Sequence, residues 1–147
     1  MKDLKNEIFL KIEEYFKNKE KVESKKIGVA YPCFDHKEVN SALDSLLDVW
    51  ISQGPKVKLF ESMFAEYIDT KFGVACNSGS SANLLALSAL IKTGRVKPGS
   101  EVIVPAATFT TVISPVIQNG LKPVFVDVEM DTYNINPESI EKAINKN

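Results

Sequence analysis

Small polar residues gather between a short apolar run at 72–76 and a helix-forming stretch that starts near Ala82. The run predicts a strand, and the sequence NSGSS at 77–81 leads from it into the predicted helix. The first backbone N–H groups of a helix have no partner within the helix, and the peptide dipoles place partial positive charge there. Gly79 would let a ligand approach the backbone closely, and the serines add hydroxyl donors. This arrangement favours an anion, and a phosphate is its natural ligand.

The same residues are also compatible with an ordinary helix cap, because serine and glycine commonly precede a helix. No lysine follows Gly79 as it would in a nucleotide P-loop, and the pattern G-x-G-x-x-G is absent from the sequence. The local pattern alone therefore leaves both interpretations open.

The composition is that of an ordinary globular domain, with 147 residues, 44% hydrophobic and 25% charged residues, and a formal net charge of −1. Such a charge gives no reason to expect nucleic acid or an anionic membrane as a partner. No apolar run reaches the roughly 20 residues of a membrane span, and the charged N-terminal stretch is no secretory signal. Cys33, Cys76 and His36 form no metal-ligand pattern, so we expect no metal site. The default expectation for the compartment is the cytoplasm.

The first half of the chain is predicted to be helical. Apolar residues recur at spacings of three and four over 3–22, 36–52 and 57–68, and 27–34 is expected to be extended or irregular. The side chains expected on buried helix faces are Val39, Leu43, Leu46, Leu47 and Trp50, followed by Leu59, Phe60, Met63, Phe64, Tyr67 and Ile68.

Strands and helices alternate from Phe72 onward. The predicted strands are 72–76, 101–105 and 123–128, and the predicted helices are 81–93, 109–119 and 138–145. This order implies parallel strands joined by crossover helices, with ligands at the carboxyl ends of the strands. The loops 77–81, 105–108 and 127–132 should therefore meet on one side of the sheet.

Phe109 begins the helix that follows the second of these loops. An aromatic side chain beside an anion site favours a flat ring bound over it. Packing of Phe109 in the core explains the residue equally well.

Three segments carry a resemblance to a known family, in order and at compatible spacing: SGSSANLLALSAL, KPGSEVIVPAATF and VIQNGLKPVFVDVEMDTYNINPESIEKAI. They resemble the N-terminal half of the large pyridoxal-phosphate domain in the DegT/DnrJ/StrS family of nucleotide-sugar aminotransferases. The subgroup that contains the CDP-4-keto-6-deoxyglucose 3-dehydrase is the most similar. The resemblance runs from about residue 28 to the end and is tightest over 73–142.

The resemblance implies an α/β fold, namely part of the three-layer αβα large domain of fold type I with an incomplete, parallel-type sheet. It divides the chain into an N-terminal helix and connector (1–26), a helical segment (27–71) and the first half of the cofactor-binding domain (72–147). It also implies a cytoplasmic homodimer that uses pyridoxal or pyridoxamine 5'-phosphate on a nucleotide-linked keto-sugar, in deoxysugar and lipopolysaccharide O-antigen biosynthesis.

Cofactor-binding residues follow from the resemblance position by position. Gly79 and the backbone amides of Ser80 and Ser81 would hold the cofactor phosphate, and Phe109 would stack on the pyridine ring.

The resemblance also places Gly54 and Pro55 near the sugar-binding mouth and gives Asp127, at a strand end, a structural role. The chain departs from the family at Val112 and Ser114, where a threonine and an asparagine are common. Polar contacts from this helix to cofactor or substrate are therefore not expected at those two positions.

No catalytic residue is assigned in this chain. The carboxylate that pairs with the pyridine nitrogen, and the lysine or histidine beside the reacting atoms, lie well downstream in the family. The lysines present, Lys71, Lys92, Lys97 and Lys122, are expected on the face away from the pocket. We therefore expect a piece of a longer enzyme, from a truncated gene product or an incomplete gene model, with no turnover alone and with aggregation-prone sheet edges.

Two functions remain open at this point. The first is the N-terminal part of an aminotransferase or a 3-dehydrase, and the SSAN sequence and the turn at 118–120 favour the dehydrase subgroup. The second is a non-catalytic α/β module that binds a phosphorylated ligand or a partner chain through the helix N-terminus at 79–82.

Overall fold

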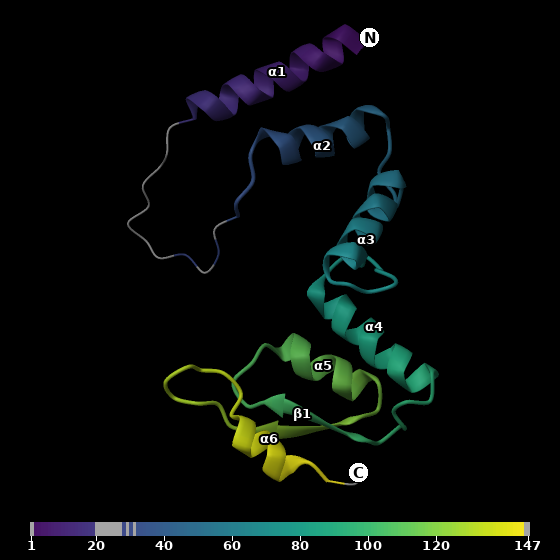
Figure 1. The fold of residues 1–147 in the computed structure, drawn as a ribbon, viewed down its shortest axis with the longest axis vertical. Helices are drawn as coiled ribbons and strands as arrows, with labels where there is room; N and C mark the ends of the chain where they lie inside the picture. The colour runs from purple at the N-terminus through teal and green to yellow at the C-terminus, as the bar shows by residue number, and fades with distance from the viewer. Residues whose placement is uncertain (1, 20–27, 29, 31, 146–147) are drawn as a thin grey trace. The chain divides into compact units, whose positions relative to one another are not determined.

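The computed structural model describes residues 2–19, 28, 30 and 32–145 (Figure 1). The chain forms two compact units, Met1–Leu59 and Phe60–Asn147. The helices and strands, in order, are α1 (Lys2–Asn18), α2 (His36–Leu47), α3 (Pro55–Tyr67), α4 (Gly79–Lys92), β1 (Glu101–Pro105), α5 (Thr110–Gln118), β2 (Lys122–Val126) and α6 (Pro137–Ala143).

Helix α2 begins with a capping box. The Asp35 side chain accepts the N–H of Lys37 at 2.7 Å, and the Glu38 side chain accepts the N–H of Asp35 at 2.8 Å. These bonds satisfy donors that the first turn of a helix leaves without partners. They place the helix start where the sequence predicts it.

The end of α2 differs from the prediction, which extended this helix to Ser52. The helix stops at Leu47, and Val49 takes a positive φ of 57°, a conformation that no helix can continue through. Trp50 therefore lies outside the helix with 49% of its surface exposed, and Leu46 and Leu47 are exposed as well. The expected burial of these three side chains is wrong. Helix α1 ends at Asn18, so Lys19 lies outside it, and residues 20–22 of the predicted range lie outside the described residues.

Charged side chains join α1, α2 and the start of α3 within the first unit. Lys5 pairs with Asp44 and, at 3.0 Å, with Asp48, while Lys56 pairs with Asp44 at 2.8 Å. Hydrogen bonds from Lys5 and then Lys56 hold the pKa of Asp44 at about 2, below its ordinary 3.8. Because all these side chains reach solvent, the pairs specify the packing of the helices more than they stabilise it.

The second unit contains a parallel pair of strands. β1 and β2 pair from Glu101↔Lys122 to Pro105↔Val126, and α5 connects them, as the alternation of strands and helices predicts. Gly120 follows α5 with a positive φ of 68°, which ends the helix at the expected place. Strand β2 is shorter than predicted, since Val128 lies beyond it and forms a bridge with Ile135.

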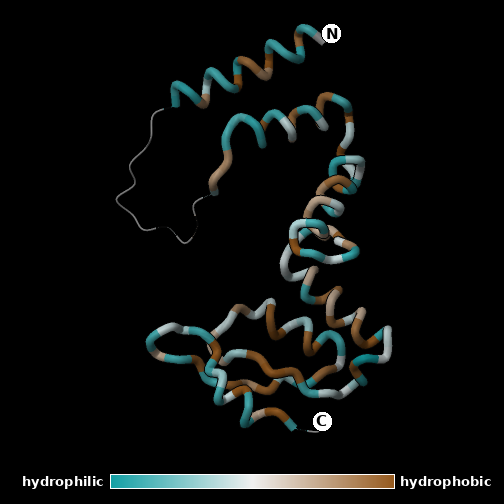
Figure 2. The backbone as a smooth tube through the Cα atoms, viewed as in Figure 1, coloured by the Kyte–Doolittle hydropathy of each residue, from teal (hydrophilic) through white to brown (hydrophobic). Residues whose placement is uncertain are grey.

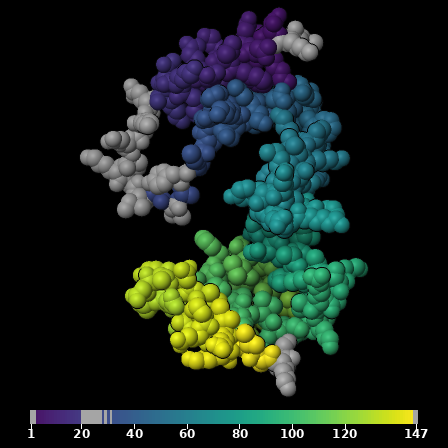
Figure 3. All heavy atoms as spheres, in the orientation of Figure 1, coloured from purple at the N-terminus to yellow at the C-terminus, as the bar shows by residue number. Residues whose placement is uncertain are grey.

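The core of this unit lies between the strands and α5. Val104, Val116 and Leu121 are buried together, and the half-buried side chains around them are Leu87, Ile91, Val96, Val102, Val112 and Ile113. Figure 2 shows hydrophobic residues along the strands and α5. Helix α6 packs on β2, and its yellow atoms lie next to green atoms in Figure 3.

Two expectations for residues 55–76 are wrong. Residues 72–76 are extended but form no strand, because no other segment of the described chain supplies a hydrogen-bonded neighbour. The apolar face of α3 is not buried: Met63 is 60% and Tyr67 85% exposed, and only Ala65 is covered. Leu59, Phe60, Phe64 and Ile68 are exposed as well. In the part of the chain that the structure describes, no helix is long and apolar enough to cross a bilayer.

Val116 is the most deeply buried large side chain, with 1% of its surface exposed. Val116→Ala removes two methyl groups and leaves a cavity, so it should lower the free energy of unfolding by about 2 kcal/mol. Urea unfolding of the variant measures this loss. Its neighbour Ile117 is 60% exposed, and Ile117→Ala should change the free energy of unfolding by less than about 0.5 kcal/mol. Equal losses in the two variants would contradict the packing described for α5.

The ion pairs of Asp44 predict a pH dependence of stability. Because the pKa of Asp44 is lowered in the folded chain, its contribution is present above its ordinary pKa of 3.8 and is lost as pH falls through about 2. Thermal unfolding followed by circular dichroism should give Asp44→Asn a lower Tm than the parent at pH 5 and a much smaller difference in Tm at pH 2, where about half of the Asp44 side chains are protonated in the folded chain. The control is Asp131→Asn, in an exposed loop, and it should have the same Tm as the parent at both pH values.

Candidate functional site

Ser78 caps helix α4 with its side chain. Its backbone is extended, with φ −164° and ψ 162°, and its Oγ accepts the N–H of Ser81 at 3.2 Å. The two hydroxyls also lie 3.2 Å apart. The helix consequently begins at Gly79, two residues before the predicted start.

Two backbone donors remain open in the first turn of α4. The N–H groups of Gly79 and Ser80 have no acceptor within the described chain, and both residues are exposed. A Cβ placed on Gly79 would meet no heavy atom within 4 Å, so a ligand can approach this backbone freely. The first turn carries no acidic residue to oppose an anion. The turn therefore offers two free N–H donors, the Ser80 hydroxyl and the positive end of a helix dipole.

The capping bond bears on the predicted role of Ser81. Its N–H already donates to Ser78, so a phosphate that used this donor would have to share it with the Ser78 hydroxyl or displace that hydroxyl. Ser80 has no such competitor. Binding of a phosphate by Gly79, Ser80 and Ser81 stays a prediction, and Gly79 and Ser80 are the donors already free to accept one.

A groove of about 270 Å³ lies beside the start of α4. Its walls come from α3, the extended segment at 73–76 and the first turn of α4. The lining residues are Phe60, Glu61, Phe64, Gly73, Val74, Ala75, Cys76, Ser78, Gly79 and Ala82. This groove gives the turn an apolar side.

Phe109 stands at the N-cap position of α5 and is 78% exposed, so it takes no part in the core of the described chain. Two contacts show that α4 and α5 run in the same direction. Asn83 approaches the Thr111 carbonyl at 3.5 Å near the start of both helices, and Ser88 bonds Asn119 at 2.8 Å further along. The start of α4 and Phe109, at the N-cap of α5, therefore lie at the same end of the unit, and Figure 1 shows the two helices starting at that end.

The loop after β2 lies at this end too, because the parallel strands β1 and β2 end side by side. The Asp127 side chain accepts the N–H of Val128 at 2.8 Å, and the Asp127 carbonyl accepts the N–H of Asn136 at 3.0 Å. These bonds agree with a structural role for Asp127. The structure thus brings the three predicted loops to one end of the second unit.

The two positions that depart from the family pattern do not contribute polar groups to the site. Val112 packs against the core, and the Ser114 hydroxyl donates to the Thr110 carbonyl at 2.8 Å within α5.

Gly54 and Pro55 belong to the first unit, whereas the predicted cofactor residues belong to the second. Gly54 is buried under the Trp50 indole, and a Cβ there would lie 2.5 Å from the Cε2 atom of that ring. Pro55 is the first residue of α3. Both line a pocket of about 610 Å³ with Trp50. Their role toward a sugar stays a prediction.

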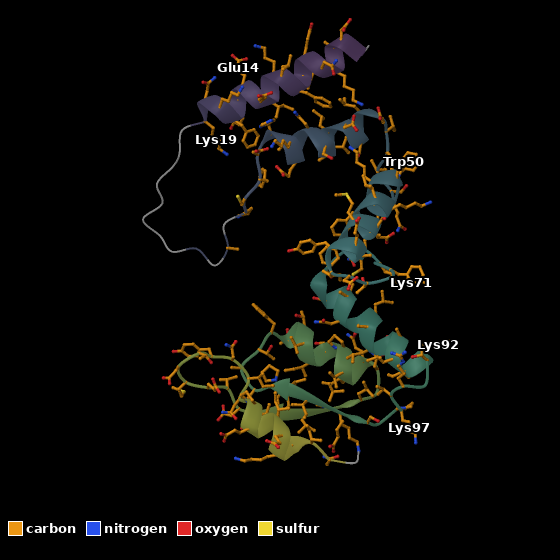
Figure 4. The ribbon with its side chains drawn as sticks, in the orientation of Figure 1. Glu14, Lys19, Trp50, Lys71, Lys92 and Lys97 are labelled. Carbon is orange, nitrogen blue, oxygen red and sulfur yellow. The ribbon has the colours of Figure 1, made fainter. Side chains whose placement is uncertain are left out.

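Two of the four lysines expected away from the pocket lie at the far end of α4. Lys92 is the last residue of this helix, which starts at Gly79, and Figure 4 shows Lys97 near the same end. The Lys71 ammonium lies over the Phe72 ring, 5.3 Å from its centre. Within the described ranges, no group of three histidine, cysteine, aspartate or glutamate side chains could hold a metal ion.

Sequence reasoning missed two residues that hold the extended segment before Ser78. Glu61 on α3 accepts the N–H of Ala75 at 2.8 Å, and Gly73 lies against the Glu61 carbonyl. Glu61 falls among the apolar residues of the α3 face, and a charge at such a position was the one available signal.

Comparison with known proteins identifies the family. The DegT/DnrJ/EryC1/StrS aminotransferase family profile matches residues 32–147. The chain belongs to this family. Lipopolysaccharide biosynthesis protein RfbH of Salmonella typhimurium is 47% identical over 112 residues, which are 74% of this chain and 26% of that protein.

Solved structures of the family share the fold. The GDP-4-keto-6-deoxy-D-mannose-3-dehydratase of Escherichia coli, with bound hydrated PLP, matches 82% of this chain and 32% of its own, with 36% identity and a TM-score of 0.75. An aminotransferase from Psychrobacter cryohalolentis matches 79% of this chain and 29% of its own, with 36% identity and a TM-score of 0.68. These likenesses confirm the predicted α/β large-domain fold. The chain spans about a third or less of the length of these relatives.

The cap of α4 can be tested apart from any ligand. Ser78→Ala removes the acceptor of the Ser81 N–H and should lower the free energy of unfolding by about 1 kcal/mol. Ser80→Ala is the matched control, because the Ser80 hydroxyl makes no hydrogen bond with the described residues, and it should leave stability unchanged. Denaturant unfolding compares the two variants, and equal stabilities would contradict the cap.

Proposed function

We propose that this chain is the part of a pyridoxal- or pyridoxamine-phosphate-dependent enzyme that anchors the cofactor phosphate, and that the enzyme acts on a nucleotide-linked keto-sugar. The observation that carries the proposal is the open first turn of α4, with the free N–H groups of Gly79 and Ser80. Membership of the DegT/DnrJ/EryC1/StrS family and the PLP-containing E. coli relative support this choice of anion.

The residues present fit the phosphate end and one ring face of the cofactor. Gly79 and Ser80 would donate backbone N–H groups to the phosphate, and the dipole of α4 would favour its charge. Phe109, exposed at the same end of the unit, would offer an apolar face to the ring. When bound, the cofactor supplies an electron sink for chemistry at a carbon next to nitrogen. The groups of this chain bind and orient it, and none of them is assigned a proton transfer.

Transamination and 3-dehydration both remain within the proposal. Relatives of each kind cover similar shares of this chain, so the likeness does not separate them. The SSAN sequence at 80–83 favours the dehydratase subgroup by resemblance. The gene sequence downstream of codon 147 decides this point: a lysine in the cofactor pocket means transamination, and a histidine means dehydration.

The assembly and location belong to the same proposal. We place the enzyme in the cytoplasm, where nucleotide-linked sugars are made, and we expect a homodimer. The exposed faces of α1 and α3 are candidate dimer contacts, since large apolar side chains there are uncovered within the described chain.

Calorimetric titration of the chain with pyridoxal phosphate tests the site. We expect saturable binding with inorganic phosphate as a competitor, and Phe109→Leu should raise the Kd about fivefold because an aromatic face is lost. Phe109→Tyr should retain the affinity, and Met130→Leu, at an 80% exposed position, serves as control. A plain nucleotide that binds as well, unaffected by Phe109→Leu, would instead support the non-catalytic module.

A further inference from the structure

The segment between α3 and the cap of α4 has few attachments. Residues 72–76 have no strand neighbour within the described ranges, so their backbone groups depend on side chains for partners. Apart from the Ala75–Glu61 bond, the Thr70 hydroxyl reaches the Phe72 carbonyl at 3.4 Å and the Cys76 thiol reaches the Ser78 carbonyl at 3.5 Å. The hydroxyl contact is long and the thiol is a weak donor, and each contact spans only two residues.

Glu61 provides the strong attachment. Its carboxylate accepts the N–H of Ala75 at 2.8 Å, across 14 residues of sequence. A hydrogen bond to an ionised carboxylate is about twice as strong as one between neutral groups. The half-buried position of Glu61 and Ala75 limits competition from water.

Gly73 allows the segment to lie in close contact with the backbone of α3, beside this bond. A Cβ at Gly73 would lie 2.6 Å from the Glu61 carbonyl oxygen, nearer than carbon and oxygen atoms approach without a bond. The absence of a side chain at Gly73 therefore lets the segment lie directly on α3. The Glu61 side chain holds the segment at Ala75, and the Glu61 backbone lies against it at Gly73.

We infer that Glu61 is a positioning residue for the phosphate-binding turn, an inference that rests on the proposed function. Ala75 is three residues before Ser78, and Ser78 orients the first turn of α4 through its bond to Ser81. The directions of the free Gly79 and Ser80 N–H groups thus depend on where Glu61 holds the chain. Glu61 itself touches no part of the cofactor in this scheme and acts only through the backbone from 75 to 78.

The test compares the affinities of the whole chain for pyridoxal phosphate and for pyridoxal, which lacks the phosphate. Glu61→Ala should raise the Kd for pyridoxal phosphate about tenfold, which is the effect of losing one charge-assisted hydrogen bond. The Kd for pyridoxal should stay unchanged. Glu61→Gln should restore the affinity, because its amide oxygen can accept the Ala75 N–H. Glu66→Ala, a glutamate elsewhere on α3 and exposed, is the control. The inference would be overturned if Glu61→Ala lowered the affinity for both ligands equally, or if Glu61→Gln bound pyridoxal phosphate as weakly as Glu61→Ala.

A second measurement separates this inference from the proposed function. Amide hydrogen exchange in the absence of ligand should be faster at Ser81 in Glu61→Ala and in Gly73→Ala than in the parent, because both changes shift the capping turn. Unchanged exchange at Ser81 would overturn the role of Glu61. A parent chain that binds neither compound, with exchange altered as expected, would contradict the proposed function and support the positioning by Glu61.

Discussion

The parallel pairing of β1 with β2 through α5 is the constraint on which the second unit depends. Parallel strands must be joined by a crossover, and the crossover helix must begin at the edge where the first strand ends. Burial of Val104, Val116 and Leu121 holds this arrangement together. Phe109 therefore stands at the carboxyl edge of the strands for a topological reason. Helix α4 runs alongside α5 in the same direction, which brings the Ser78 cap to the same edge.

The open donors of α4 illustrate how a site can be prepared at little cost to stability. An N–H group without a partner is costly when buried, but at an exposed helix end water satisfies it. Gly79 and Ser80 can thus stay available while the Ser78 hydroxyl satisfies the next donor. A phosphate that replaces water there gains the helix dipole and already oriented donors. The backbone needs no rearrangement, except at Ser81, where ligand and cap compete for one N–H.

Local chemistry explains which elements the sequence predicts well. β1 has the predicted bounds, 101–105, because an apolar run lies between a glycine turn and a proline, and Gly120 marks the end of α5 by its positive φ. The end of α2 was missed because it depends on Val49 in a left-handed conformation, which a β-branched residue rarely adopts. The strand at 72–76 was wrongly predicted, since composition specifies an extended chain but not its neighbour. The same distinction between local signals and contacts with distant segments applies to the candidate site. The small residues around Gly79 are a local signal, whereas the bond from Glu61 joins two distant segments, and its one sign in the sequence is a charge among the apolar residues of α3.

The cofactor contacts proposed for this chain would explain how one fold can serve different reactions. A phosphate group takes no part in bond making at the far end of the cofactor, so its binding stabilises ground state and transition state alike. Such binding fixes the position of the ring but does not select the reaction. Selection requires groups that face the reacting atoms, and none is assigned among the residues described. A dehydratase and an aminotransferase can therefore share the α4 turn and the aromatic at the start of α5, as the similar TM-scores of 0.75 and 0.68 show for the fold. The position of the phosphate contacts still matters to transamination and to dehydration, because displacing the ring by about 1 Å misplaces the reacting atoms in either reaction.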